Sequence, residues 1–390
     1  MGKLVLIDGH SILNRAFYGV PELTNSKGLH TNAVYGFLNI MFRVIEDEGA
    51  DYLAVAFDLK EPTFRHKMYA AYKGTRKPMP QELHEQVPVM KEVLTAMGVP
   101  ILTKAGYEAD DILGTIAKRC AAEGVEVSIV SGDRDLLQLA SDRIMIRIPK
   151  TKRGGTEIEN YHTQDVIDKY GLKPEQIIDM KGLMGDSADN IPGVPGIGEK
   201  TAVKILTAFP TVEAAYEHLE EVEPKRAREL LRANPELAKL SKQLATIKTD
   251  CEIDVTLEDA KLGNLFTSEA FEWIKRLELK SLFSRFDSET VQSVVPDFDT
   301  STKIECATSI ELSTAAASSG STLLMNLASI LNVSFFLAQF SSARYIARGP
   351  RSLPPIPICT TVVNFSPAPF VISPACTLFA KSAILACCSV

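Results

Sequence analysis

The sequence has fewer basic than acidic side chains, few histidines, no closely spaced Cys pair of the zinc-binding type, and a single Trp. Lys and Arg number 42 against 49 Asp and Glu, which gives a formal net charge of −7 at pH 7. This balance argues against a protein that holds nucleic acid by bulk positive charge alone. There are 6 His and no Cys-x-x-Cys pair, so we expect neither a zinc site of that type nor a disulfide framework.

Two further absences concern targeting and the last quarter of the chain. The apolar run 3–7 is short and is stopped by Asp8, so it does not resemble a secretory signal, and we expect a cytosolic protein. Residues 301–390 contain no Asp and few other charges. Their uncharged run 323–340 includes Asn, Ser and Gln, which makes it a poor membrane span.

The sequence does contain a series of acids that follow predicted strands. Three apolar runs predict buried strands, at 3–7, 52–57 and 125–130, with helical patterns between them at 33–48 and 111–122. This alternation predicts a parallel, doubly wound α/β sheet. Asp8, Asp58 and Asp133 follow the three runs, and Asp135 comes two residues later. Because the carboxyl ends of parallel strands meet at one edge of a sheet, these acids should gather at one rim.

Two other acidic clusters add to this set. Glu108 and Asp111 are three residues apart at a predicted helix entry and should share a face, as should Asp186 and Asp189. A single acid of this kind is usually a helix cap or a turn residue, but capping does not explain all of them. The complete set is Asp8, Asp58, Glu108, Asp110, Asp111, Asp133, Asp135, Asp186 and Asp189.

Gathering these carboxylates requires cations, because like charges about 4 Å apart repel by about 4 kcal/mol at an effective dielectric of 20. The cluster therefore predicts bound metal. Oxygen ligands without nearby His or Cys favour Mg²⁺ or Mn²⁺ over zinc. Two such ions about 4 Å apart can activate water and stabilise the leaving oxygen in phosphodiester hydrolysis.

A Gly-rich loop follows the last acidic cluster. Gly193, Gly196 and Gly198 lead into Lys200 and an amphipathic helical pattern, whose first amides could hold a phosphate. The loop is not a P-loop, because Glu199 separates Gly198 from Lys200, and its Gly spacing is the reverse of a dinucleotide-binding fingerprint. It fits a helix-hairpin-helix turn that contacts DNA phosphate directly or through a cation. The alternative is a simple Gly-rich connector.

The segment 64–77 combines basic and aromatic side chains. It contains Phe64, Arg65, His66, Lys67, Tyr69, Tyr72, Lys73, Arg76 and Lys77. This composition suits phosphate contacts and base stacking along a nucleic-acid strand, and the alternative is a solvated helix face. Its place beside the acidic rim favours strand binding, because an acidic protein needs a local cationic guide.

These patterns divide the chain into three parts. Residues 1–165 hold the predicted strands and form the α/β part. Residues 166–290 show helical spacings with Pro and Gly punctuation and form a helical lobe. Residues 291–390 form a linker and an atypical low-charge tail, which we expect to be poorly ordered.

The motifs, read in order, identify a family. They are Asp8, Asp58, Tyr107–Asp111, Ser131–Asp135 and Gly185–Gly193. Over about residues 1–290 the chain resembles the N-terminal 5'-3' exonuclease (flap endonuclease) domain of bacterial DNA polymerase I. The resemblance implies a PIN-like parallel-sheet nuclease domain followed by a helix-hairpin-helix lobe. It also implies cleavage of 5' flaps and 5' ends, including RNA primers, in DNA replication and repair, by a monomer in the bacterial cytoplasm and nucleoid.

The resemblance further implies roles for particular residues. Two Mg²⁺ or Mn²⁺ ions would be held, one by Asp8, Asp58, Glu108 and Asp110, the other by Asp133, Asp135, Asp186 and Asp189. Catalytic roles are implied for Lys73, Arg76 and Asp111, the last standing between the two ligand groups. DNA contacts, with K⁺ at the helix-hairpin-helix, are implied for Arg15, Tyr72, Gly193, Gly196, Gly198 and Lys200.

The resemblance ends after Pro296. Polymerase I chains of this family continue into a 3'-5' exonuclease-like domain and a polymerase domain, and neither fits in about ninety residues. We interpret the tail as out-of-frame or degenerate sequence and expect a nuclease without polymerase activity. Two alternatives stay open: a catalytically impaired remnant of a truncated polymerase I that binds branched DNA, and a PIN-type ribonuclease, which the helix-hairpin-helix loop disfavours.

Overall fold

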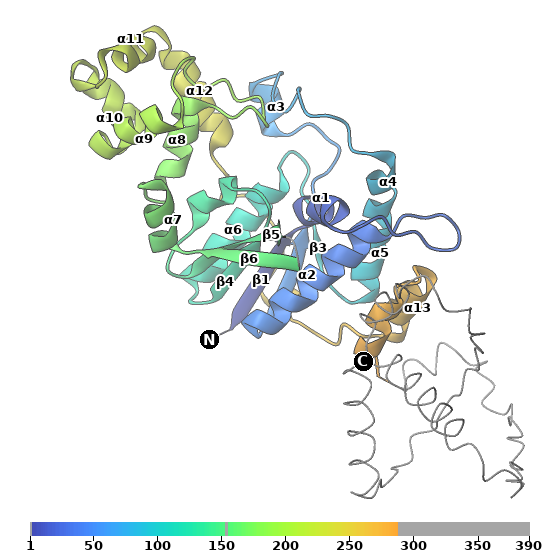
Figure 1. Ribbon diagram of the computed structural model, residues 1–390. Coiled ribbons are helices and arrows are strands. Elements are labelled where there is room, and N and C mark those ends of the chain that lie inside the picture. The colour runs from blue at the N-terminus through green and yellow to red at the C-terminus, as the bar shows by residue number, and fades with distance from the viewer. Residues whose placement is uncertain (1, 153–154, 288–390) are drawn as a thin grey trace, which may run out of the picture. The chain divides into compact units, whose positions relative to one another are not determined.

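A six-stranded sheet organises the molecule (Figure 1). The structure is a computed structural model that describes residues 2–152 and 155–287, so the tail predicted over 291–390 lies outside the described residues. The strands follow the order β3-β2-β1-β4-β5-β6. Their bounds are β1 Lys3–Asp8, β2 Tyr52–Ala56, β3 Ile101–Leu102, β4 Glu126–Val130, β5 Ile144–Lys152 and β6 Gly155–Tyr161.

The three predicted strands form the centre of this sheet. β1 pairs in parallel with β2 on one side and with β4 on the other. Val5, Leu6 and Ile7 are fully buried, since both faces of the sheet are covered. A strand buried on both faces is a continuous apolar run, which is why the sequence signal was clear. The predicted common edge for the acids that follow these strands is confirmed.

The sequence analysis missed the hairpin of β5 and β6 at the sheet edge. β5 contains the charged Arg147, whose guanidinium is buried because it lies 2.6 Å from Glu48 Oε1 and 3.2 Å from Asp47 Oδ2. A charge in the middle of an apolar run hides the strand pattern. β6 runs antiparallel to β5, as a short connection requires. The sheet is therefore mixed: the three predicted strands are parallel, as expected, and β6 adds an antiparallel strand at the edge.

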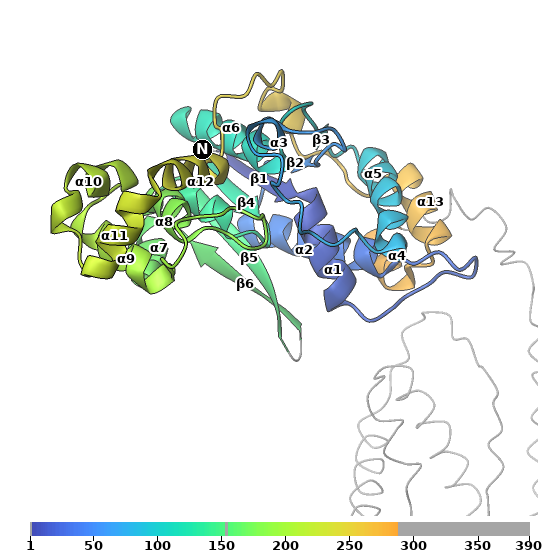
Figure 2. The same cartoon turned by 90° about the horizontal axis from the view of Figure 1, so that it is seen from above.

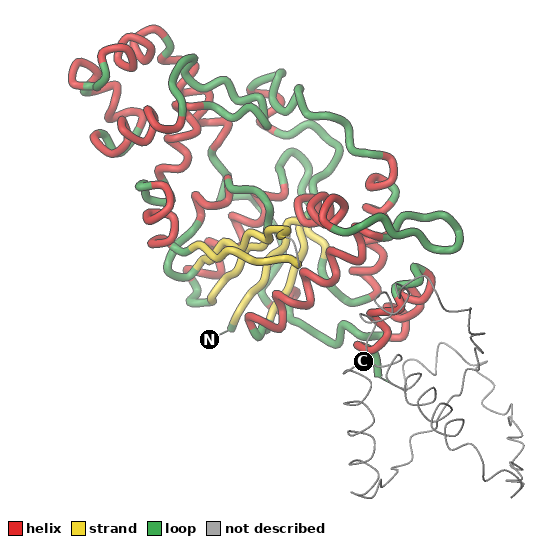
Figure 3. The backbone as a smooth tube through the Cα atoms, viewed as in Figure 1, coloured by secondary structure: helices red, strands yellow, loops and turns green. Residues whose placement is uncertain are grey.

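Helices cover both faces of the sheet (Figure 2; strands are yellow and helices red in Figure 3). Val5, Ile7 and Val55 pack against α1, α2, α5 and α13 on one face. Leu4 and Leu6 pack against α6 on the other. The bounds are α1 Gly9–Gly19, α2 Asn32–Glu48, α5 Gln86–Ala96, α6 Ala109–Ala122 and α13 Ser268–Arg276. The predicted double winding is confirmed.

The chain is helical after β6, as predicted. The helices are α7 Thr163–Tyr170, α8 Gln176–Met184, α9 Glu199–Ala208, α10 Val212–Glu217, α11 Lys225–Ala233 and α12 Pro235–Ala245. The chain then returns to the sheet, where Leu262 N–H donates to Asp51 O (2.8 Å) and α13 packs with α5. The end of the predicted helical lobe thus packs against the α/β part.

Shorter helices complete the described chain. They are α3 Phe64–Met68 and α4 Gln81–His84, with the 3-10 turns η1 Asp135–Leu139, η2 Leu219–Glu221, η3 Glu258–Ala260 and η4 Lys280–Arg285. Cys120 and Cys251 are buried free thiols. Among residues 2–152 and 155–287, no helix combines the length and the apolar character needed to cross a membrane.

The turn from Gly185 to Gly193 connects α8 with α9. Asp186 and Ile191 exchange backbone hydrogen bonds of 2.9 and 2.7 Å, which close the turn. Gly193 N–H donates to the buried Ser241 Oγ of α12 (2.9 Å). Asp186 and Asp189 therefore lie in a turn and bind different partners. The expectation that they share a helix face was wrong, because the chain leaves the helix before Asp186.

We predict that Gly193→Ala lowers the free energy of unfolding by about 2 kcal/mol or more. Gly193 has a φ of 61°, and an added Cβ would lie 2.3 Å from Gly185 N, a backbone atom that cannot move aside. Gly198→Ala is the matched control, since an added Cβ there meets no described atom within 4 Å. Urea unfolding followed by circular dichroism measures both, and equal midpoints would contradict the prediction.

Candidate active site

Asp8 stands where β1 ends and α1 begins. Its carboxylate accepts hydrogen bonds from Ser11 N (3.0 Å) and Ser131 Oγ (2.8 Å). Burial, and then the charges of Asp58 and Asp133, raise the pKa of Asp8 to about 6 despite these hydrogen bonds. The carboxylate is therefore held in place by neutral donors while other carboxylates lie close to it.

Asp58 follows β2 and is stabilised in its charged form. Burial would raise the pKa of Asp58, but His10 and the backbone N–H of Ala109 lower it to about 2. The Ala109 N–H donates to Asp58 Oδ1 (2.8 Å), and His10 Nδ1 lies 3.3 Å from Asp58 Oδ2. Asp58 thus remains an anion at the rim over the whole neutral pH range.

Asp110 completes a group of four carboxylates. Burial raises the pKa of Asp110 well above its ordinary value, and the charges of Asp8, Asp133 and Asp58 raise it further. These four carboxylates and that of Glu108 line one cavity of about 890 Å³. Because Glu108 is paired with Lys73, we keep the name open acid group for the other four: Asp8, Asp58, Asp110 and Asp133. Burial is the largest cause of the raised pKa values at Asp8 and Asp110, and repulsion between the carboxylates adds to it.

Glu108 and Asp189 lie beside this group but are bound to basic and aromatic side chains. Lys73 Nζ lies 3.0 Å from Glu108 Oε1. The Tyr72 hydroxyl lies 3.1 Å from both Glu108 Oε2 and Asp189 Oδ2, and Arg76 donates to Asp189. Tyr72 is only 4% exposed. Its predicted role in DNA contact does not fit this arrangement, because its ring is buried and its hydroxyl is occupied by carboxylates.

Asp111 was expected to be catalytic, and the structure corrects that expectation. The side chain is fully buried, and its two oxygens accept from Arg65 Nη1 and Nη2 at 2.8 Å each. The backbone N–H groups of Glu108 (3.0 Å) and Lys248 (2.9 Å) also donate to it. A carboxylate with its lone pairs occupied in this way positions its neighbours and does not face a substrate.

Asp135 and Asp186 are brought together by a lysine. Lys181 of α8 donates to Asp135 and, at 2.5 Å, to Asp186 Oδ2. Burial, and then Asp133, raise the pKa of Asp135 to about 7 against the effect of Lys181. Burial would raise the pKa of Asp186, but Lys181 lowers it. We call Asp135 and Asp186 the lysine-bridged pair.

The nine predicted carboxylates therefore divide into different environments. Asp8, Asp58, Asp110 and Asp133 line the cavity together with Glu108. Glu108 and Asp189 also contact Tyr72, Lys73 and Arg76, whereas Asp135 and Asp186 bind Lys181 and Asp111 binds Arg65. As the side chains stand, no three or more His, Cys, Asp or Glu of the described residues are arranged around a common metal position. Lys and Arg side chains occupy several of the carboxylates instead.

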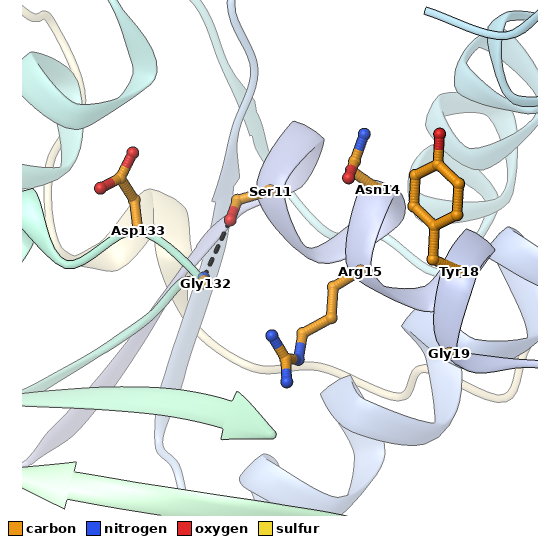
Figure 4. A pocket seen from close by; sticks show the side chains of 7 residues that line it. All are labelled: Ser11, Asn14, Arg15, Tyr18, Gly19, Gly132 and Asp133. Atoms are coloured by element: carbon orange, nitrogen blue, oxygen red, sulfur yellow. Dashed lines mark hydrogen bonds between the residues drawn. The ribbon is translucent and has the colours of Figure 1, made fainter. Parts of the chain in front are cut away.

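Arg15 lines a second pocket of about 540 Å³ next to the open acid group (Figure 4). The pocket is also lined by Asn14, Tyr18 and Asp133, and Ser11 Oγ accepts a hydrogen bond from Gly132 N–H across its floor (2.8 Å). Arg15 Nε is buried and has no hydrogen-bond partner among the described residues. The structure thus brings Arg15 beside the acidic rim, which the sequence alone did not show.

The Gly-rich loop lies at the start of α9. Gly196, Gly198 and Lys200 are exposed there, as a surface that binds DNA requires. Gly193 is buried, and its N–H is bound to Ser241 Oγ. The predicted DNA contact of Gly193 therefore does not fit, because its backbone holds the turn together.

Sequence reasoning missed three residues of the site, Arg65, Lys181 and His10. Arg65 was noted only as part of a basic segment, and Lys181 and His10 were not considered at all. Each is an isolated charged or imidazole residue without a motif of its own. These residues matter because of contacts with residues far away in the sequence. Arg65 contacts Asp111, 46 positions away, Lys181 contacts Asp135, also 46 positions away, and His10 contacts Asp58, 48 positions away.

A doubly wound sheet that gathers carboxylates at its strand ends, with Lys and Arg beside them, is typical of enzymes that act on phosphate esters. Comparison with known families agrees. The family described as "5'-3' exonuclease, N-terminal resolvase-like domain" matches residues 3–171, and "5'-3' exonuclease, C-terminal SAM fold" matches residues 172–267. The chain therefore belongs to the 5'-3' exonuclease family.

Curated relatives confirm the resemblance inferred from the motifs. DNA polymerase I of Bacillus caldotenax is 46% identical over 294 residues, which cover 75% of this chain and 33% of the relative. DNA polymerase I of Bacillus subtilis (strain 168) is 46% identical over 291 residues, with the same coverage of 75% and 33%. The chain spans about a third of the length of these relatives.

Solved structures agree with the fold. The bacteriophage T5 5'-exonuclease with bound zinc ions is 25% identical, with a TM-score of 0.53, and the match covers 71% of this chain and 98% of that one. The T5 D15 protein co-crystallised with metal ions is 23% identical, with the same TM-score of 0.53 and the same coverage of 71% and 98%. The predicted class of a PIN-like nuclease domain with a helical lobe is confirmed.

We predict opposite effects for two neighbouring substitutions in the metal-free protein at pH 7.5. Asp111→Asn should lower the free energy of unfolding by about 3 kcal/mol, because it leaves the buried Arg65 guanidinium without its partner. Asp110→Asn should raise it by about 1 kcal/mol or more, because it removes a charge that burial and neighbouring carboxylates disfavour. Urea unfolding in EDTA measures both, and the same sign for both variants would contradict the prediction.

The gain from Asp110→Asn should depend on pH. A carboxyl whose folded pKa is raised lowers stability once the unfolded chain releases a proton that the folded chain retains. The penalty therefore grows as pH rises above the ordinary Asp pKa of about 3.9 and is complete above the raised folded value. Wild type and Asp110→Asn should therefore unfold at similar urea concentrations at about pH 3.5. If Asp110→Asn stabilised the protein as much at this low pH as at pH 7.5, the stabilisation would not come from removal of the Asp110 charge.

Proposed function

We propose that the chain is a structure-specific 5'-3' exonuclease and flap endonuclease that hydrolyses phosphodiester bonds of DNA. The observation that carries this proposal is the cavity in which the open acid group faces Lys73 and Arg76. Carboxylates alone would repel a phosphodiester, and basic side chains alone would bind it without cleavage. A cavity lined by both can hold the phosphate and the cations that hydrolysis needs.

The residues around the cavity support distinct roles. Lys73 Nζ is partly exposed beside Glu108, and the Lys73 backbone N–H donates to Asp189 O (2.8 Å), which ties it to the acidic turn. Arg76 is about half exposed beside Asp189. Both cations can contact the scissile phosphate and hold it against the open acid group, and Arg15 can contact an adjoining phosphate from the next pocket.

The donor set fits hard divalent cations, Mg²⁺ or Mn²⁺. The open acid group offers only oxygen donors, and its carboxylates lie close enough together for their charges to raise the pKa values of Asp8 and Asp110 beyond the effect of burial. The similarity to the T5 5'-exonuclease, which binds zinc ions, supports divalent metal dependence. Asp8, Asp58, Asp110 and Asp133, with Glu108, would hold one ion, and Asp135, Asp186 and Asp189 would contribute to a second. Two such ions, when bound, supply activation of water and charge stabilisation at the leaving oxygen.

The proposed substrates are branched or nicked DNA with a 5' flap and RNA primers paired with DNA. The exposed Gly196, Gly198 and Lys200 support a contact between the start of α9 and the backbone of the downstream duplex, with K⁺ as a bridging cation. The similarity to DNA polymerase I relatives supports a role in replication and repair. We further propose that the chain acts in the cytoplasm and nucleoid as a monomer. We also propose the division into a nuclease domain at 1–165 and a DNA-binding lobe at 166–290.

A 5'-labelled flap duplex tests the activity. We expect cleavage with Mg²⁺, no cleavage in EDTA, and a loss of at least about 100-fold for Asp133→Ala, since that carboxylate lies in the open acid group. The full chain and a chain ending near residue 296 should cleave alike. An intact flap with Mg²⁺ at protein concentrations that saturate binding would overturn the proposal and favour a protein that binds branched DNA without cutting it.

In the same assay, Lys73→Ala separates catalysis from binding. Because Lys73 lies at the cavity and away from the proposed duplex contact at α9, its loss should slow cleavage at saturating enzyme at least about tenfold more than it weakens duplex affinity. Lys200→Ala is the matched control, with the larger effect expected on affinity. Equal losses of rate and affinity in Lys73→Ala would refute its role.

A further inference from the structure

Lys181 occupies the position where a cation would sit between two carboxylates. Its ammonium group contacts both Asp135 and Asp186, the second at 2.5 Å from Oδ2. The side chain is 12% exposed, so its charge is largely removed from water and is balanced mainly by these two acids. The three residues come from separate places: Asp135 begins η1, Lys181 lies in the last turn of α8, and Asp186 follows that helix.

Asp8, Asp110 and Asp133 of the open acid group have no comparable bridging lysine among the described residues, and the fourth member, Asp58, lies 3.3 Å from His10 Nδ1. Asp8 accepts from two serine-derived donors that carry no charge, and no lysine or arginine of the described residues forms an ion pair with Asp8, Asp110 or Asp133. The two sets of acids are adjacent, because Asp133 and Asp135 belong to one loop and the charge of Asp133 acts on Asp135. Lys181 therefore joins Asp135 and Asp186 directly, whereas Asp8, Asp110 and Asp133 have no such bridging lysine among the described residues.

We propose that Lys181 is the built-in counter-ion of the lysine-bridged pair, and that a divalent ion can bind between Asp135 and Asp186 only when the Lys181 ammonium moves away. The open acid group then takes up its ion first and more tightly, and Lys181 weakens the second ion. Lys181 is a positioning residue in this scheme, because it acts through the two carboxylates. The inference rests on the proposed divalent metal dependence and adds an order of loading to it.

The same contact accounts for the arrangement of the unloaded acids. The Lys181 ammonium holds the carboxylates of Asp135 and Asp186 together without metal, whereas two neighbouring carboxylates with no cation between them repel each other. Lys181 thus keeps the second ligand pair assembled in the metal-free protein. Its four-carbon stem is flexible, so the ammonium can withdraw while the carboxylates remain in place.

Ion binding by the protein alone tests this proposal. Mn²⁺ is titrated into the full chain at low ionic strength, and free Mn²⁺ is followed by its electron paramagnetic resonance signal. The variants are Lys181→Met and Lys181→Gln, which remove the charge, and Lys181→Arg, which keeps it. Lys242→Met is the matched control, because Lys242 also joins two carboxylates, Asp179 of α8 at 2.6 Å and Glu213 at 2.5 Å, outside the acidic rim.

We expect Lys181→Met and Lys181→Gln to bind the weaker Mn²⁺ ion at least about tenfold more tightly than wild type, since a positive charge has been removed from beside its ligands. Lys181→Arg and Lys242→Met should keep the wild-type affinity. In EDTA, Lys181→Met and Lys242→Met should both have a lower melting temperature than wild type. When Mg²⁺ is added, the melting temperature of Lys181→Met should rise by more than that of wild type, and that of Lys242→Met should not.

Unchanged or weaker Mn²⁺ binding by both uncharged Lys181 variants would overturn the inference, as would an equal tightening in Lys242→Met. Two uncharged variants are used so that poor folding of one leaves the comparison intact. The measurement does not depend on cleavage. A protein that fails to cut flaps, but whose Mn²⁺ affinity still responds to loss of the Lys181 charge, would overturn the proposed function while supporting this inference.

Discussion

The buried guanidinium of Arg65 holds the two halves of the described structure together at the acidic rim. It pairs with both oxygens of Asp111 at 2.8 Å and approaches Glu108 at 3.3 Å. It also donates to the carbonyl oxygens of Leu244 (2.9 Å) and Thr246 (2.7 Å), where the chain leaves α12. One side chain therefore joins α3, the start of α6 and the end of the helical part. Because a buried charge is costly without its partners, all of these segments must be in place together.

The rim that Arg65 supports is a region where function opposes stability. Burial and mutual repulsion raise the pKa of Asp8 to about 6 and the pKa of Asp135 to about 7. Each unit of such a shift costs about 1.4 kcal/mol at neutral pH. The fold tolerates this cost because helices cover β1, β2 and β4 on both faces. The free energy of burying this large apolar core offsets the unfavourable electrostatics of the carboxylates at the sheet edge. Sites that bind cations or substrate commonly show this exchange.

Much of the fold could be predicted from the sequence because its central strands are simple. β1, β2 and β4 are apolar runs that end in acids, and parallel pairing then requires those acids to meet at one edge. The same reasoning placed Asp8, Asp58 and Asp133 correctly beside one another, with Asp110 added by its place at the start of α6. It failed at β5 and β6, where Arg147 interrupts the apolar pattern, and at the turn that carries Asp186 and Asp189, where a backbone bridge replaces the expected helix.

The sequence by itself determined the three central strands, the set of acids and the family to which the chain belongs, because these depend on residue types at short and regular spacings. Only the tertiary structure decided what each carboxylate does. Asp110 faces the cavity while its neighbour Asp111 is buried against Arg65, and Asp135 and Asp186 meet on Lys181. These differences arise from contacts between residues far apart in the chain, which set burial and counter-charge, and no local pattern records such contacts.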